Sequence, residues 1–445
     1  MGCGASAPPP EKYRFHYTGD AGHEEFDEKR KAETDASAAQ VSGRKDSFKA
    51  GDGKIHAAEP EAPASTPASV GAAASKMKRK VSAKDRFKNA KNATKTASAF
   101  SAAGKQRSKR NKGPHGWIAK DMLLGKASLD KFEPKRVIGT GLMGTVQLAM
   151  FKKDETWCAI KMIKKDYVCR HNDGRHIKAE RALLNACDSP FIVNLFGTFQ
   201  DKKFVYFVME YAAGGELFSR LHNTKGIFGC NTSKFYLCEI LLAIEHVQSH
   251  GYAYRDLKPE NIMLDEEGHC KLIDFGFAAR PDKDGLLHTN VGTPAYLSPE
   301  QLNHKKTGGY KPYVDYWSFA ILMYEFMTGV TPFCKNFKDS SYEIYTRVIT
   351  GKIKFPSHFD PLGRELVTAL TNVDVDKRLK DAKSVKAHSY FEGVDWARVE
   401  NRELAPPHVP KLKEKGDCHY FEQYGPVNDS EKAPDKIDHS VFAGF

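Results

Sequence analysis

The chemistry and the fold of this 445-residue chain are indicated best by residues 254–261, which read YRDLKPEN. This stretch places a carboxylate (Asp256), an ammonium group (Lys258) and a side-chain amide (Asn261) within six residues. A DFG triplet adds a second carboxylate, Asp274, thirteen residues after Asn261. An isolated Asp-x-Gly usually marks a tight turn, but amide and carboxylate oxygens are also the ligands that Mg²⁺ prefers. The spacing favours the second interpretation, and we predict that Asn261 and Asp274 bind two magnesium ions.

A glycine-rich segment lies upstream, where residues 139–144 read GTGLMG. Gly139, Gly141 and Gly144 would allow backbone N–H groups to approach phosphates without interference from a Cβ atom. The same pattern marks dinucleotide-binding folds. Here, however, a strand rather than a helix is expected to follow, and no acidic residue ends a second strand as it does in those folds. The segment therefore favours a phosphate-binding loop of another kind.

Lys161 lies at the centre of an apolar run, CAIKMI, at residues 158–163. A single lysine is most often a solvated surface charge. Within a buried strand, however, an unpaired ammonium group is costly. We therefore expect Lys161 to have an acidic partner.

The apolar pattern divides the chain into a small strand-rich part and a larger helical part, which predicts a two-lobed α+β fold. Strands are expected at 132–137, 145–150, 158–163, 193–199 and 204–210, and helices at 175–186, 232–250 and 314–328. The apolar run 319–326 is too short to cross a membrane and is expected to be a buried core helix.

The segments outside this folded part differ in composition. Residues 1–115 are rich in Ala, Ser, Lys, Gly and Pro, and they carry too few large apolar side chains to offset the entropy of ordering. We predict a disordered tail there, a linker at 116–131 with a helix near 117–124 that packs on the domain, and a proline-punctuated tail at 392–445.

The positive charge of the chain is concentrated in one segment. Residues 76–112 hold fourteen Lys or Arg against one acid, which gives this segment a charge of +13. The whole chain carries +12, so the remaining residues together carry −1. Such a run can bind anionic lipid or nucleic acid, or keep a tail solvated. Only Phe87 and Phe100 are interleaved with it, so we expect no nucleic-acid partner. The nine cysteines show no CxxC pair and indicate the reduced thiols of a cytosolic protein.

These motifs, of which SPE at 298–300 is the last, occur in the order found in protein kinases. The resemblance to protein kinases covers residues 132–391. Within the kinases the chain resembles the AGC group, and especially the catalytic subunit of cyclic-AMP-dependent protein kinase. The resemblance is carried by 254–261, by DFGFA at 274–278, by MEYAAGGE at 209–216 and by the terminal FAGF.

The resemblance implies transfer of the γ-phosphate of ATP, with Mg²⁺, to Ser or Thr of protein substrates. Asp256 would orient the acceptor hydroxyl as a base, and Lys258 would stabilise the transferring phosphoryl group. Lys161 would pair with the α- and β-phosphates and with Glu180. The other expected nucleotide-binding positions are Gly139, Gly141, Gly144, Val146, Glu210, Ala212, Glu216, Asn261 and Asp274.

The same resemblance implies a preference for basic substrates. Glu216, Glu260 and Glu325 match acidic positions that receive arginines before the target residue. Ala295 and Asn290 replace a Glu and a Leu of the family, which leaves the preference for the residue after the target open. Two alternatives also stay open, an AGC kinase that cyclic nucleotides do not control and a pseudokinase scaffold. The scaffold is disfavoured because the four polar residues Lys161, Asp256, Asn261 and Asp274 are all present.

Regulation is predicted at Thr289, in the expected activation loop, whose phosphate Arg255 and His176 would hold. Residues 286–288 read LLH and offer no arginine before Thr289, so we predict a separate upstream activating kinase. That kinase would dock on the terminal Phe442 and Phe445, which in the family fill an apolar pocket on the small lobe. Phe421 and Tyr424 match the aromatic part of the family's C-terminal tail. In the family, this part of the tail crosses the nucleotide site. His288 replaces a tryptophan that docks the cyclic-nucleotide-binding regulatory subunit, so this partner stays open.

The N-terminus reads MGCGAS, which fits myristoylation of Gly2 with palmitoylation of Cys3. One acyl chain binds membranes weakly, and a second chain or a polybasic segment stabilises the attachment. We therefore predict a kinase held on the cytoplasmic face of an anionic membrane by acyl groups, and also present in the cytoplasm. Ser47 and Ser82 follow basic residues, and their phosphorylation would weaken the attraction to lipid.

Overall fold

A computed structural model of the chain describes residues 128–141, 143–223, 226–336, 338–426 and 437–445. These described residues all belong to one unit of the chain. The predictions for residues 1–115, the helix near 117–124 and the lipidation sites Gly2 and Cys3 lie outside the described residues. Among the described helices, none combines the length and the apolar character needed to span a bilayer.

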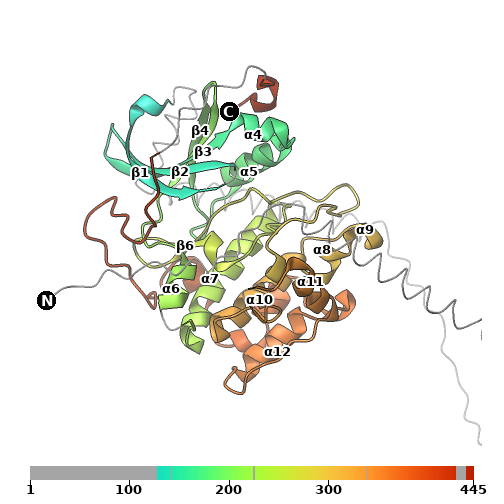
Figure 1. Cartoon of the computed structure of the whole chain (residues 1–445). Coiled ribbons are helices and arrows are strands. Elements are labelled where there is room, and N and C mark those ends of the chain that lie inside the picture. Colours follow the sequence, from blue (N-terminus) through green and yellow to red (C-terminus); the bar gives the residue numbers. More distant parts are fainter. Residues whose placement is uncertain (1–127, 142, 224–225, 337, 427–436) are drawn as a thin grey trace, which may run out of the picture. The chain divides into compact units, whose positions relative to one another are not determined.

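The first half of the described chain forms a five-stranded antiparallel sheet with the order β1-β2-β3-β5-β4 (Figure 1). All five predicted strands are present: β1 (Phe132–Thr140), β2 (Gly144–Phe151), β3 (Thr156–Lys164), β4 (Leu195–Gln200) and β5 (Phe204–Glu210).

Several strand boundaries differ from the prediction by one to three residues, and the pairing of the backbone explains two of these differences. β1 continues to Thr140 because this residue still pairs with Thr145 of β2. β4 begins at Leu195 rather than at 193, because the backbone N–H of Val193 donates to Leu272 O of β7, at 3.0 Å, and so pairs outside this sheet.

Two helices follow β3 and lie beside the sheet, α4 (Lys165–Arg170) and α5 (Gly174–Ala186) (Figure 1). Helix α5 buries Ile177, Leu183 and Leu184 in the main core, and with them the carboxylate of Glu180. A charged residue on the buried face of an amphipathic helix requires a partner. The helix therefore sets the position of one candidate site residue.

The second half is mainly helical, which confirms the α+β two-lobed fold. Its helices are α6 (Leu217–Asn223), α7 (Cys230–Ser249), α8 (Pro299–Leu302), α9 (His304–Thr307), α10 (Val314–Thr328), α11 (Ser341–Thr350), α12 (Pro361–Leu370), α13 (Ala382–Lys386) and α14 (Trp396–Glu400). A two-stranded sheet, β6 (Ile262–Leu264) with β7 (Cys270–Leu272), follows the YRDLKPEN stretch.

Helix α10 forms the centre of the helical part. Fourteen of its fifteen residues are buried, so the prediction of a core helix at 314–328 is confirmed. Asp315 and Glu325 are buried with the apolar residues of this helix, and both take part in the site described below.

The last segment of the chain returns to the small sheet. Cys418 and Phe421 pack with Ile138 and Leu148 of β1 and β2. Further on, the short 3₁₀ helix η7 (His439–Phe442) buries Phe442 completely in the main core.

Candidate active site

Lys161 lies in the middle of β3, between Val146 of β2 and Phe207 of β5. Its Nζ lies 2.8 Å from Glu180 Oε1 and 3.1 Å from Asp274 Oδ1. Burial disfavours the charged ammonium, but the charges of Asp274 and Glu180 outweigh it and raise the pKa of Lys161. The acidic partner expected for this strand lysine is therefore present, and it is the predicted Glu180.

Asp274 stands at the edge of this cluster. Lys161 lowers the pKa of the Asp274 carboxyl, and half of the Asp274 side chain is exposed (51%). Its backbone adopts φ 54°, in the left-handed region, which non-glycine residues seldom occupy. Strain of this kind is typical of functional sites. The neighbouring Phe275 is fully buried in the main core, so the triplet directs one side chain inward and leaves the carboxylate accessible.

The YRDLKPEN stretch holds its own polar groups close together. Asp256 Oδ2 accepts a hydrogen bond from Asn261 Nδ2 at 2.7 Å and lies 3.0 Å from Lys258 Nζ. Asn261 Nδ2 also donates to the backbone oxygen of Asp256, at 2.8 Å. Because the amide nitrogen is used in this way, the carbonyl oxygen of Asn261 is the atom that it can offer to a cation.

Thr293 completes this network, although no sequence motif pointed to it. Its hydroxyl donates to Asp256 Oδ1 and accepts from Lys258 Nζ, both at 2.9 Å. Thr293 lies 37 residues after Asp256 in a segment without a distinctive pattern. The one available signal was its position five residues before the SPE triplet.

The backbone of the stretch is fixed by Asp315, a residue that no sequence motif marked. Its carboxylate accepts from the backbone N–H of Tyr254 at 3.0 Å and from that of Arg255 at 2.8 Å. Asp315 is fully buried, and burial raises the pKa of its carboxyl group. A carboxylate in a mainly apolar helix is a recognisable signal, because a buried charge needs donors.

The side chain of Arg255 connects this stretch to the predicted phosphorylation site. Nη1 donates to Thr289 Oγ1 at 2.7 Å and to Tyr310 Oη at 2.9 Å, and Nε donates to Phe277 O at 2.7 Å. The structure thus brings Arg255 to Thr289. His176, the other predicted partner, lies in the first turn of α5, where its Nδ1 is 2.7 Å from Asp173 Oδ1. Its role in holding the phosphate stays a prediction.

The glycines of the 139–144 segment differ in their surroundings. Gly141 and Gly144 exchange backbone hydrogen bonds at 2.8 and 3.3 Å, which closes a tight turn. A Cβ atom on Gly144 would lie 1.8 Å from Met162 O, so the sheet itself requires glycine there. A Cβ atom on Gly141 would meet nothing within 4 Å, and Gly139 has ordinary contacts with Val146. The role of Gly141 in phosphate binding therefore stays a prediction.

The predicted hinge is joined to the C-terminal tail. Tyr211 Oη donates to Asp417 O at 2.6 Å, and its ring lies 5.5 Å from that of Phe421. Glu210 turns its side chain to Lys271, at 2.9 Å, and Ala212 is buried. Recognition of a nucleotide base by the backbone of the hinge stays a prediction.

The three predicted substrate-binding carboxylates are not equivalent. Glu325 is buried (6% exposed) and accepts a hydrogen bond from Tyr296 Oη. Burial, together with the charge of Glu260, raises the pKa of Glu325 to about 8. Glu260, on the 3₁₀ helix η3 (Pro259–Asn261), therefore lies near Glu325. Glu216 lies elsewhere in the chain and forms an isolated backbone β-bridge with Met263 of β6.

The terminal aromatic pair is docked on the small lobe. The ammonium group of Lys165 lies 5.0 Å from the Phe442 ring, and Gln200 Nε2 donates to Phe442 O at 2.9 Å. The Phe445 ring meets Phe207 edge-on at 5.7 Å and lies 4.9 Å from the guanidinium of Arg181 on α5. The tail thus contacts the helix that carries Glu180.

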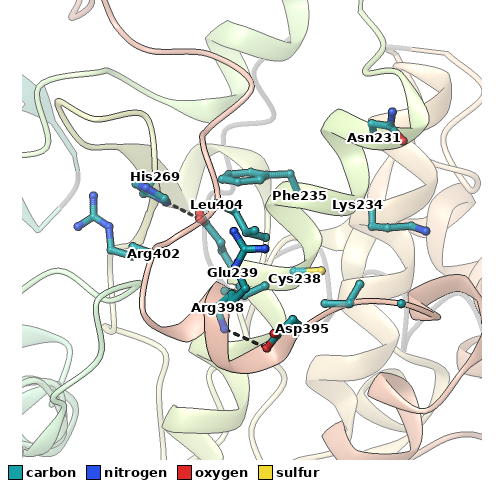
Figure 2. A pocket seen from close by; sticks show the side chains of 13 residues that line it. Asn231, Lys234, Phe235, Cys238, Glu239, His269, Asp395, Arg398, Arg402 and Leu404 are labelled. Carbon is teal, nitrogen blue, oxygen red and sulfur yellow. Dashed lines mark hydrogen bonds and ion pairs between the residues drawn. The ribbon is translucent and has the colours of Figure 1, made fainter.

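A cavity of about 300 Å³ lies apart from these residues, between α7 and residues 393–404 (Figure 2). Glu239 and His269 are both buried in its wall, with Oε1 and Nδ1 2.6 Å apart. Glu239 also accepts from the backbone N–H of Cys270 at 2.8 Å, and none of the candidate site residues lines the cavity. These contacts hold α7 against the start of β7, so the pair is explained by packing of the fold rather than by a reaction.

The small antiparallel sheet, the helical lobe and the two polar clusters between them define the class of protein kinases. A family model of the protein kinase domain matches residues 132–391. The chain belongs to this family, as a serine/threonine kinase related to the catalytic subunits of cAMP-dependent protein kinases.

Several curated proteins are similar over most of the described chain. The cAMP-dependent protein kinase catalytic subunit PRKX of Homo sapiens is 41% identical over 326 residues, which cover 72% of this chain and 88% of the relative. The cAMP-dependent protein kinase catalytic subunit of Dictyostelium discoideum is 39% identical over 310 residues, 69% of this chain and 46% of the relative. A RAC family serine/threonine-protein kinase homolog of the same organism is 37% identical over 298 residues, 66% and 65% of the two chains.

Proposed function

We propose that this kinase transfers the γ-phosphate of ATP to Ser or Thr residues that follow arginines in protein substrates. The observation that carries the proposal is the pair of polar clusters, Lys161–Glu180–Asp274 and Asp256–Lys258–Asn261. Phosphoryl transfer depends mainly on positioning and on charge stabilisation. The two clusters offer cations for phosphate oxygens and a carboxylate for the acceptor hydroxyl.

In this proposal Asp256 orients the acceptor hydroxyl, and Lys258 neutralises charge on the transferring group. Lys161, oriented by Glu180, binds the α- and β-phosphates. Asn261 and Asp274 would hold Mg²⁺, which neutralises the charge of the triphosphate when bound. Their fit to this ion rests on the exposed carboxylate of Asp274 and on the amide oxygen of Asn261.

The preference for arginine rests on Glu216, Glu260 and Glu325. A buried carboxylate with a pKa of about 8 is stabilised in its charged form by an incoming guanidinium group, which can bind a carboxylate through two hydrogen bonds. Peptides with the patterns Arg-Arg-x-Ser and Ala-Ala-x-Ser test the preference. An equal kcat/KM for the two peptides would exclude the preference for arginine. If neither peptide incorporated phosphate, the result would favour the pseudokinase alternative.

Control by a separate kinase is proposed from the surroundings of Thr289. Arg255 already donates to its hydroxyl, so a phosphate there would gain a charge-assisted hydrogen bond. The upstream kinase would have to recognise or displace the docked Phe442 and Phe445. Full phosphorylation of Thr289 in bacterially expressed protein, abolished by Asp256→Asn, would instead show self-activation.

Control by a cyclic-nucleotide-binding regulatory subunit is proposed from the relatives, several of which are cAMP-dependent kinases. His288 stands at the expected docking position, and its Nε2 lies 2.7 Å from Asp282. Inhibition of the kinase by such a subunit, relieved by cyclic AMP, would support this control. Unchanged activity at saturating subunit would favour the alternative of an AGC kinase that cyclic nucleotides do not control.

Attachment to the cytoplasmic face of a membrane is proposed from the sequence alone. Gly2, Cys3 and the basic run 76–112 together provide acyl groups and charge. Gly2→Ala should move the protein from membrane to soluble fractions. Ser47→Asp with Ser82→Asp should reduce binding to anionic vesicles, and unchanged partition would count against the release mechanism.

A further inference from the structure

Three side chains with metal-binding atoms lie together outside the candidate active site: Cys187, His246 and His250. The thiol sulfur and one ring nitrogen of each histidine all lie within 4.8 Å of one another. The three residues are half-buried, so the cluster is shielded from bulk water but still open to an ion. The two imidazole rings have centroids 4.6 Å apart.

The fold places these residues at the ends of two helices. Cys187 follows α5 directly as its C-cap residue. His246 lies in the last turn of α7. His250, four residues after His246, is the C-cap residue of the same helix, so both rings project from the same side. The cluster therefore bridges the helix that carries Glu180 and a helix of the large lobe.

The hydrogen bond that His250 makes leaves a nitrogen lone pair of its ring available. His250 Nδ1 lies 2.9 Å from His246 O, and because the carbonyl oxygen can only accept, Nδ1 carries the proton. Nε2 of His250 is then the lone-pair atom of the neutral ring. An imidazole whose Nδ1–H donates to a backbone carbonyl is the usual arrangement of a metal-binding histidine.

His246 is unprotonated at Nε2, because this atom accepts from the backbone N–H of Asp188 at 3.1 Å. This hydrogen bond already ties the residue after Cys187 to α7. Binding of a cation at His246 would exchange it for a metal–nitrogen bond.

We propose that Cys187, His246 and His250 form a binding site for Zn²⁺, with water as the fourth ligand. One thiolate and two imidazoles are the ligand types that zinc prefers, whereas Mg²⁺ and Ca²⁺ need oxygen ligands. Tetrahedral zinc separates its nitrogen and sulfur ligands by about 3.3–3.6 Å. The cluster thus has to close by on the order of 1 Å, within reach of side-chain rotation.

Zinc at this position would link α5 to the segment that leads into the active site. Glu180 precedes Cys187 by seven residues on α5, and Asp256 follows His250 by six. Burial raises the pKa of Cys187 to about 12, so without a cation the thiol keeps its proton, and binding releases it. Zinc affinity therefore increases with pH, and bound zinc stabilises the folded protein.

The full-length chain, freed of metal with a chelator, tests the site by Zn²⁺ titration against a chromophoric competitor. We expect one tight equivalent, and with Co²⁺ a thiolate charge-transfer band. Cys187→Ser should abolish the band. Cys187→Ser and His250→Gln should each lower zinc affinity by at least about 10–100-fold, the cost typical of changes to the outer shell of a metal site. Cys230→Ser, an exposed thiol at the start of α7, serves as the matched control and should bind like the wild type.

Wild-type zinc affinity in both site variants, or a cobalt band that persists in Cys187→Ser, would overturn the proposal. Circular dichroism of the metal-free variants checks that they fold. A test without substitutions is alkylation of Cys187 followed by peptide mass spectrometry. Zinc should slow this modification by at least an order of magnitude, and an equal rate with and without zinc would also overturn the proposal.

Discussion

The carboxylate of Asp315, on α10, holds the backbone of Arg255 in place through a 2.8 Å hydrogen bond to its N–H. Arg255 has φ 71°, a conformation that a non-glycine residue keeps only when its surroundings impose it. The same carboxylate accepts from Tyr254, so one buried side chain orients the two residues that precede Asp256. The geometry of the candidate base is therefore imposed from the core of the large lobe.

Asp315→Ala should lower both stability and activity. The substitution leaves two buried N–H groups without an acceptor, at a cost of about 2–4 kcal/mol in the free energy of unfolding. It also allows Arg255 to relax, so kcat should fall by at least about tenfold. Urea unfolding and peptide kinetics measure the two effects. Asp376→Ala, whose side chain is 98% exposed, is the control and should change stability by less than about 0.5 kcal/mol.

Glu325 should make stability depend on pH. Its folded-state pKa of about 8 lies above the ordinary value, so between those two values the folded protein binds more protons than the unfolded chain. Stability therefore falls as pH rises from about 5 to 8. In the wild type this pH dependence lowers the free energy of unfolding by on the order of 2–4 kcal/mol across this range, and in Glu325→Gln this decrease should be absent. Urea unfolding at several pH values tests this, and parallel pH profiles for the two proteins would contradict it.

The docked terminus should support the small lobe. Phe442 is fully buried, and truncation of such a side chain costs about 3–5 kcal/mol when the site stays in place. In a terminal segment we expect local undocking instead, because the opening of such segments costs little. Phe442→Ala should therefore increase hydrogen exchange over 437–445 and α5, and lower kcat. Val409→Ala, at an exposed position (57%) of the same tail, should change neither.

The tail that crosses the small sheet depends on a glycine at 416. Gly416 has φ 71°, and an added Cβ would lie 2.2 Å from the Trp157 ring. Gly416→Ala should displace the neighbouring Asp417, which binds Tyr211 of the hinge, and raise the KM for ATP several-fold. Gly393→Ala has a similar φ of 77° but open space around it, so it controls for the backbone penalty of about 1 kcal/mol. Equal effects of the two substitutions would contradict this account.

Local patterns were sufficient to predict the five strands and the core helix α10, which follow from periodicity in a short window. The position of Lys161 in an apolar strand predicted an acidic partner, and the resemblance to protein kinases assigned that partner as Glu180. Residues that act through long-range contacts were not found, such as Asp315, Thr293 and Tyr310. Glu300 of the SPE triplet was noted, but its buried two-point contact with Arg378, 78 residues later, was not. Such partners depend on how distant segments pack, which neither composition nor spacing records.

The central claim is that Asp256 and its neighbours carry out phosphoryl transfer from ATP. The most direct measurement is single-turnover transfer of labelled γ-phosphate to an Arg-Arg-x-Ser peptide by the wild type and by Asp256→Asn. The account predicts rapid labelling of the serine by the wild type and a rate lower by at least about 10²-fold for the variant, with ATP binding retained. Equal rates for the two proteins, or no transfer by the Thr289-phosphorylated wild type, would contradict it.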